Sequence, residues 1–116
     1  MNFDEFRRQM ESYRKAVDDE AASLKDSYLA LDRLHAVYRK FDLEERAMAN
    51  KVLVEWALSE DENLRFDALA LIDDLKIKDA KTALLQLASR LATSQTSSAP
   101  YELRKVKRII ADLDLV

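Results

Sequence analysis

The sequence predicts an all-α protein built as an antiparallel array of about five to six helices. Apolar residues recur at intervals of three and four along almost the whole chain, which is the spacing of one helix face. The chain contains no glycine, and Pro100 is its only proline. Tight hairpin turns and phosphate-binding loops usually depend on glycine at positive φ, so the composition disfavours both. The array is expected to be a solenoid of stacked helix pairs or an irregular bundle.

Residues 1–41 carry two helical patterns. The first contains Phe3, Phe6, Met10, Tyr13, Val17, Ala21 and Leu24, and the second contains Leu31, Leu34, Tyr38 and Phe41. Asn2 and Glu5 have the spacing of a capping pair at the start of the first helix. The polar stretch DDEAASLKDS (18–27) between the patterns predicts a turn.

A single helix over about residues 3–40 is the alternative for this region. Phe3, Met10, Val17, Leu24, Leu31 and Tyr38 keep one heptad phase across the proposed turn. Glu20 and Ser27, however, are polar where a continuous seam needs apolar residues. We therefore favour two helices, and the single helix stays open.

Residues 42–77 predict a pair of helices. Asp42 and Glu45 have capping-box spacing, and the first helix follows with Ala49, Val52, Leu53, Trp56 and Ala57 as its apolar stripe. We expect Trp56 in the core. The acidic turn SEDEN (59–63) leads into a helix over 61–77, whose main apolar face holds Leu64, Ala68, Leu71, Ile72 and Leu75.

Residues 79–115 predict a second pair. The connection KIKDAK (76–81) leads to a helix with Ala80, Ala83, Leu84, Leu87, Ala88 and Leu91, and the polar loop TSQTSS (93–98) follows it. The last helix begins at Ser98 or Ala99, with Pro100 in its first turn. Its apolar positions are Leu103, Val106, Ile109, Ile110 and Leu113. We expect the three regions to form one domain over residues 1–116.

A weak internal repeat relates the two pairs. A shift of 38 residues aligns LIDDLKI (71–77) with IIADLDL (109–115). Periods of this length, made of paired helices, are typical of α-solenoids.

The stretch from Asp61 to Leu75 resembles the second helix of a HEAT repeat, in which an acidic turn precedes an arginine, a small residue and spaced aliphatic residues. Here the matching residues are Arg65, Ala68, Ile72 and Leu75. The resemblance covers residues 42–77 and, more loosely, 79–115, where the turn is longer and Leu103 aligns with Arg65. It implies a curved stack of antiparallel helix pairs that binds other macromolecules.

The composition disfavours catalysis and metal binding. Without cysteine the chain has no disulfide, no thiolate zinc site and no cysteine nucleophile. His35 is the only histidine, so sites that need two histidines cannot form. Asp32 can share a helix face with His35, but no nucleophile or oxyanion site accompanies this pair. We expect no enzymatic activity, no cofactor and no metal.

The sequence also predicts a cytoplasmic protein without a membrane partner. The segment MNFDEFRRQMES is charged from residue 4 and has no apolar stretch behind it, unlike a signal peptide. No run approaches the roughly 18 apolar residues of a membrane span. The lack of cysteine suits a reducing compartment.

Negative charge is concentrated in the middle of the chain. Residues 41–80 hold eleven acidic and five basic side chains, a net charge of −6, whereas the whole chain carries −3. Such a band can dock a basic partner, although an ordinary solvated face has the same composition. Within it, Phe66 and Leu69 point away from the main apolar stripe. They either pack on the amino-terminal helices or form an exposed aromatic contact within an acidic ring.

The candidate partner-binding residues are therefore Glu60, Glu62, Phe66, Asp67, Asp73 and Asp74. They predict a non-catalytic protein-binding module with a basic partner. The size, acidity and helical build resemble, in general character, a small bacterial immunity or antitoxin-type protein. That resemblance implies an inhibitor that covers a basic toxin or nuclease through its acidic surface, with charge complementarity speeding association.

Two alternatives use other parts of the chain. Four basic residues in RKVKR (104–108) can contact phosphates, namely Arg104, Lys105, Lys107 and Arg108, while Val106 faces the core. No aromatic residue interleaves with them and the whole chain is acidic, so nucleic acid is the less favoured partner. The heptad-like amino terminus suggests, third, an oligomerising scaffold.

Overall fold

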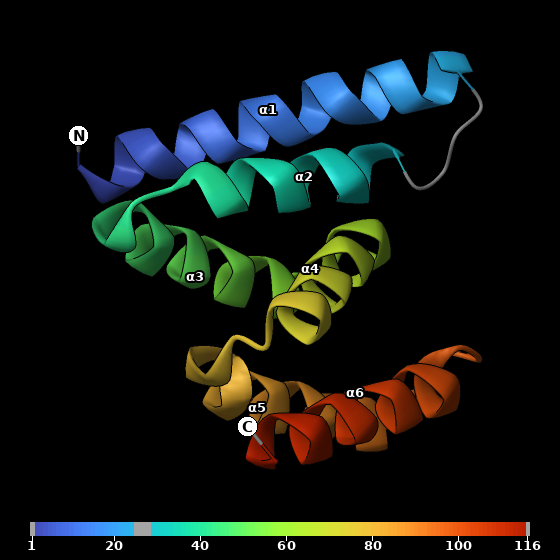
Figure 1. Cartoon of the computed structure of the whole chain (residues 1–116). Coiled ribbons are helices and arrows are strands. Elements are labelled where there is room, and N and C mark those ends of the chain that lie inside the picture. The colour runs from blue at the N-terminus through green and yellow to red at the C-terminus, as the bar shows by residue number, and fades with distance from the viewer. Residues whose placement is uncertain (1, 25–28, 116) are drawn as a thin grey trace. The chain divides into compact units, whose positions relative to one another are not determined.

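The protein is all-α, as its computed structural model shows for residues 2–24 and 29–115 (Figure 1). Six α-helices follow one another: α1 (Phe3–Leu24), α2 (Leu29–Lys40), α3 (Leu43–Ala57), α4 (Glu62–Leu75), α5 (Lys81–Ala92) and α6 (Ala99–Asp114), with a 3-10 turn η1 (Lys78–Ala80) before α5. No strand occurs in these two described ranges. The predicted fold class is therefore confirmed. None of the described helices is long and apolar enough to cross a membrane.

The chain divides into two compact units, Met1–Val52 and Leu53–Val116, and α3 crosses the boundary. In the first unit, α1 and α2 pack side by side and run antiparallel (Figure 1). The buried ring of Phe6 packs against Phe41 in an edge-to-face arrangement, with 5.2 Å between the ring centroids. The hydroxyl of Tyr38 donates a hydrogen bond to Asn50 Oδ1 at 2.8 Å, which ties α2 to the middle of α3. That residues 1–116 act as one domain stays a prediction.

Two helices, and not one, occupy residues 3–40, as favoured from the sequence. The predicted turn at 18–27 is nevertheless wrong for its first part, because α1 continues through Leu24; residues 25–27 lie outside the described ranges. Glu20, whose polarity suggested the turn, is helical and accepts two hydrogen bonds from Arg33 on α2, at 2.6 and 2.7 Å. The charge of Glu20 thus stabilises the contact between α1 and α2.

Both capping motifs predicted for this unit are present. The side chain of Asn2 accepts a hydrogen bond from the amide of Glu5 at 2.8 Å. At the start of α3, Asp42 and Glu45 bond to each other's amides at 2.8 and 3.0 Å, which is the reciprocal pattern of a capping box.

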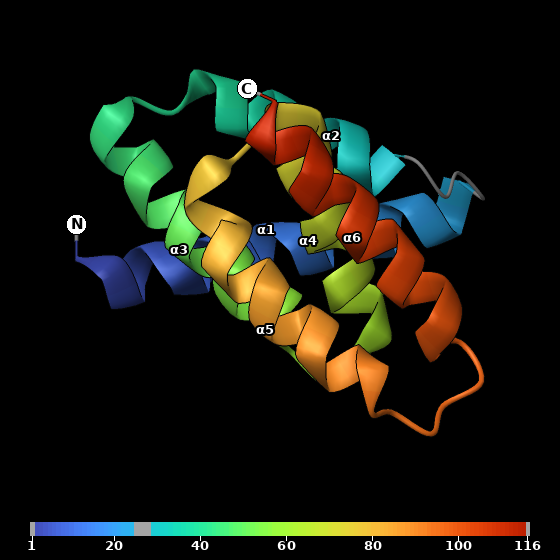
Figure 2. The same ribbon diagram turned by 90° about the horizontal axis from the view of Figure 1, so that it is seen from below.

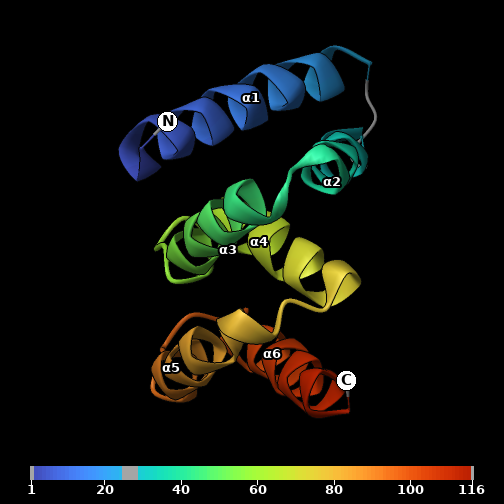
Figure 3. The same ribbon diagram turned by 60° about the vertical axis from the view of Figure 1, so that its left-hand side comes forward.

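The second unit contains α4, α5 and α6. Helices α5 and α6 pack against each other in antiparallel directions, and α4 also packs on α6 (Figures 2 and 3). The largest fully buried side chains come from all three helices, for example Ile72, Leu84, Leu87, Val106 and Ile109. Trp56 is also buried, as expected.

The turns of this unit are built without glycine. Asp61 caps α4, since its side chain accepts hydrogen bonds from the amides of Asn63 and Leu64 at 2.9 and 3.3 Å. At the other end, Lys76 adopts the left-handed conformation, φ 53° and ψ 55°, that usually falls to glycine. A non-glycine residue pays a steric cost in this conformation.

The helix boundaries follow the 38-residue period. Helix α3 begins at residue 43 and α5 at residue 81. After the same shift, α4 and α6 begin and end within one residue of each other. The pairs differ in their connections, because α5 ends at Ala92 and a longer loop precedes α6.

Candidate functional site

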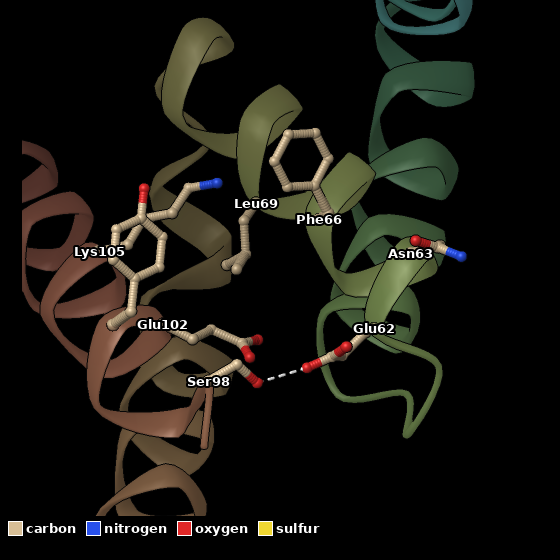
Figure 4. A pocket seen from close by; sticks show the side chains of 8 residues that line it. Glu62, Asn63, Phe66, Leu69, Ser98, Glu102 and Lys105 are labelled. Atoms are coloured by element: carbon tan, nitrogen blue, oxygen red, sulfur yellow. Dashed lines mark hydrogen bonds between the residues drawn. The ribbon is translucent and has the colours of Figure 1, made fainter. Parts of the chain in front are cut away.

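A groove of about 250 Å³ lies between α4 and α6 in the second unit (Figure 4). We call it the aromatic groove. Its lining residues are Glu62, Asn63, Phe66 and Leu69 from α4, and Ser98, Tyr101, Glu102 and Lys105 from the start of α6 and the residue before it. In each set, Glu62 or Asn63 is followed by Phe66 and Leu69, and Ser98 by Tyr101 or Glu102 and then Lys105, at steps of three or four residues, so each set shares one face.

Two exposed aromatic side chains flank a buried aliphatic floor in this groove. Leu69 is 1% exposed, and it points into the space between the helices (Figure 4). Phe66 is 52% exposed and Tyr101 is 70% exposed. Covering half of a phenylalanine side chain is worth on the order of 1 kcal/mol. The groove is therefore a place where a partner gains free energy by excluding water.

A cation already lies on one of these rings. The ammonium of Lys105 is 4.3 Å from the centroid of the Phe66 ring, within the range of a cation–π interaction. Burial lowers the pKa of Lys105 by disfavouring its charged form, and the nearby charge of Arg108 lowers it further.

The end of the groove near the amino terminus of α4 is acidic. Glu62 Oε1 accepts a hydrogen bond from the hydroxyl of Ser98 at 2.6 Å (Figure 4). The Glu62 side chain is nevertheless 62% exposed, so it can meet a partner. Glu60 and Asp61 are exposed immediately before it. Glu60 itself lines a neighbouring hollow, together with Arg90 of α5.

A buried ion pair holds α4 and α6 at a fixed spacing behind the groove. The guanidinium of Arg65 donates to both carboxylate oxygens of Glu102, at 2.7 and 3.1 Å. It also donates to the carbonyl oxygen of Ser59 at 3.0 Å, which fixes the turn before α4. The hydrogen bond to Glu102 raises the pKa of Arg65 despite its burial. Because Glu102 is paired with Arg65, its negative charge is largely neutralised within the protein.

The basic residues of α6 lie beside the groove. Tyr101, Arg104, Lys105 and Arg108 line a second hollow of about 480 Å³. Arg108 donates to Asp73 and to Asp112, each at 3.0 Å. Burial acts to raise the pKa of Asp73, but hydrogen bonds from Arg108 and Lys76 outweigh it and the pKa is lowered. The charge of Arg108 is therefore partly neutralised.

The predicted partner-binding residues separate in the structure. Glu62 and Phe66 line the aromatic groove, and Glu60 lies close to its acidic end. Asp67 is 8% exposed, so the expectation that it contributes surface charge is wrong. Asp73 is exposed only in part and bonds to Arg108, which removes most of its free charge. Asp74 is exposed but does not line the groove.

The predicted phosphate-contacting residues also differ in their exposure and in their contacts. Lys107 and Arg104 are exposed, Lys105 lies on Phe66, and Arg108 is paired with carboxylates. Val106 is fully buried, as expected. The acidic residues of α4 and the basic residues of α6, treated as rival sites from the sequence, thus meet at one helix–helix contact.

Of the residues that α6 and its preceding residue contribute to the groove, only Lys105 was a candidate from the sequence, and then for contact with phosphates. Ser98, Tyr101 and Lys105 are three and four residues apart, so their common face could be predicted. The face of α4 that they oppose could not be predicted from the sequence, because it depends on how two helices 37 residues apart pack. Among the described residues, no cluster of three metal-ligating side chains occurs.

Comparisons with known proteins assign neither a family nor a function to the chain. No protein-family model matches the chain, and no curated protein or solved structure matches it either.

Proposed function

We propose that this chain is a non-catalytic protein-binding module whose contact surface is the aromatic groove. The observation that carries the proposal is the pair of exposed rings, Phe66 and Tyr101, on neighbouring helices around the buried Leu69. Aromatic residues in a desolvated centre with a polar rim are the usual composition of interface hot spots. Glu62, Ser98 and Lys105 supply the polar rim.

The proposed partner is a basic protein. Glu62 lines the groove and Glu60 and Asp61 precede it in the chain; all three are exposed and attract positive charge. In its more specific form, the proposal is an immunity or antitoxin-type inhibitor in the cytoplasm that covers a basic toxin or nuclease. The 38-residue period of the helix boundaries supports a HEAT-like relationship, which we propose as the origin of the helix pairs.

Nucleic acid is the second candidate partner. One observation favours it, because Tyr101 lies in the same hollow as Arg104, Lys105 and Arg108, and an aromatic ring beside cations suits single strands. Asp73 and Asp112 neutralise part of this patch, which weakens its attraction for phosphates. We therefore place it after the protein-binding proposal.

Selection from a displayed library of random twelve-residue peptides tests the proposal. We expect the purified chain to enrich a family of peptides, and we expect Phe66→Ala and Tyr101→Ala each to weaken their binding at least about fivefold, since a hot-spot truncation costs more than 1 kcal/mol. Leu85→Ala is the matched control, because Leu85 is 49% exposed but lies on α5 outside the groove.

Two results would refute the groove as the contact surface. One is enriched peptides that bind the Phe66→Ala and Tyr101→Ala variants as tightly as the unchanged chain. The other is equal weakening by Leu85→Ala, which would indicate non-specific apolar binding.

A further inference from the structure

The Phe66 ring forms a binding site for a cation, and the ammonium of the chain's own Lys105 occupies this site. Lys105 reaches across from α6 to α4, and its ammonium lies 4.3 Å from the ring centroid. Attraction between a cation and an aromatic face extends to about 6 Å. The geometry therefore shows which chemical group this ring accepts.

Lys105 is held only weakly on the Phe66 ring. Its ammonium is partly desolvated, and Arg108 adds repulsion, so its pKa is lowered. The two carboxylates that offset this, Asp73 and Glu102, already bond to Arg108 and Arg65. Within the described part of the chain, Lys105 has no ion pair of its own. It can therefore leave the ring and return to water at little cost.

The rest of the groove matches a long cationic side chain. Leu69 provides an apolar floor for methylene groups, and Tyr101 provides a second exposed ring. Glu62 lines the same groove one helical turn before Phe66, and its side chain is 62% exposed, although its Oε1 accepts the Ser98 hydroxyl and lies 4.0 Å from the Arg65 guanidinium. Arginine suits such a site better than lysine, because its planar guanidinium is weakly hydrated and stacks on aromatic faces.

We infer that the aromatic groove receives an arginine side chain of the partner protein, which displaces Lys105 from Phe66, lays its methylene stem over Leu69 and stacks its guanidinium on the Phe66 ring, while the negative charge of Glu62 attracts it from the same groove. This inference rests on the proposed function and names the group that the groove recognises. Lys105 then competes with the partner for the Phe66 ring. Removing the charge of Lys105 should therefore tighten binding of the partner.

Four nine-residue peptides test the inference, identical except for a central arginine, citrulline, norleucine or glutamate. Citrulline keeps the shape of arginine without its charge. Binding is measured by fluorescence anisotropy of labelled peptides with the full-length chain. We expect the arginine peptide to bind most tightly.

Three variants give the expected pattern for the arginine peptide. Lys105→Met removes the competing cation and keeps the packing of the stem, so binding should tighten by roughly two- to fivefold, the size of an exposed cation–π interaction. Phe66→Leu keeps an apolar side chain but loses the ring, and Glu62→Gln keeps an acceptor for Ser98 but loses the charge. Each should weaken binding by roughly the same factor.

Lys107→Met is the matched control, because Lys107 is an exposed lysine of the same helix outside the groove. It should change binding much less than Lys105→Met does. Circular dichroism of each variant confirms that the helices are retained.

The possible outcomes separate the inference from the proposed function. Weaker binding of the arginine peptide to Lys105→Met, or preference for the glutamate peptide, overturns the inference. If the citrulline and norleucine peptides bind as tightly as the arginine peptide and all three need Phe66, the inference fails and the groove remains the contact surface. If no peptide responds to any change in the groove, both fail.

Discussion

Arg65 and Glu102 form the charge pair on which the groove depends most directly. Their side chains are 10% and 15% exposed, and two hydrogen bonds join them. Removing one partner of a buried pair leaves an uncompensated charge, whereas replacing both by apolar residues is often tolerated. The sequence indicated Arg65 through its resemblance to a repeat motif, but it did not indicate Glu102, because 37 residues separate the pair.

We predict that Glu102→Gln lowers the free energy of unfolding by about 3 kcal/mol, because the buried guanidinium loses its counter-charge. The double variant Arg65→Met with Glu102→Leu should recover most of this loss. Urea denaturation followed by circular dichroism measures both. A double variant less stable than Glu102→Gln would mean that the pair contributes net stability by itself.

Asp73 gives a prediction for the dependence of stability on pH. Its folded-state pKa is lowered from the usual 3.8, as Arg108 and Lys76 outweigh the effect of burial. A carboxyl with a lowered folded pKa contributes stability above its unfolded pKa and loses it as the pH falls through the folded pKa. We therefore expect Asp73→Asn to cost about 1 kcal/mol at pH 7, and this cost should shrink as the pH falls below the usual 3.8 and the carboxyl becomes protonated. An undiminished cost at low pH would contradict this origin.

At the scale of the helices, the caps could be predicted and the helix ends only in part. Asp42 and Glu45 cap α3 where the sequence placed them, since a cap is a local hydrogen-bond pattern. Asp61, which the sequence placed inside the helix, caps α4. The end of α1 could not be predicted, because Glu20 is stabilised by Arg33 on the next helix. The end of α4 falls at Lys76, in a conformation that local rules reserve for glycine.

We predict that Lys76→Gly stabilises the protein by about 0.5–1 kcal/mol, because glycine adopts the left-handed conformation without steric cost. The loss of the exposed contact with Asp73 at 3.3 Å subtracts little from this gain. Lys107→Gly, in the interior of α6, is the opposite control and should cost about 1 kcal/mol. Thermal unfolding gives both values, and a destabilised Lys76→Gly variant would show that the lysine itself matters.

At the scale of the whole molecule, the sequence predicted an all-α chain of about five to six helices, and this is confirmed. The absence of glycine and the spacing of apolar residues are properties of the whole chain, and they need no knowledge of packing. The candidate site was predicted only by half, since Phe66 and Glu62 line the groove and Asp67 is buried. Charge counted along a sequence does not show which residues neutralise each other after folding, as Asp73 and Arg108 do.

The central claim is that the chain binds a partner through the aromatic groove. Amide chemical shifts of the isotope-labelled full-length chain, recorded while a library-selected peptide is added, test it most directly. We expect the largest shifts on residues lining the groove, among them Phe66, Leu69, Tyr101 and Lys105. Shifts centred on Asp74, on Arg104 and Lys107, or on the first unit, with the groove unchanged, would contradict it.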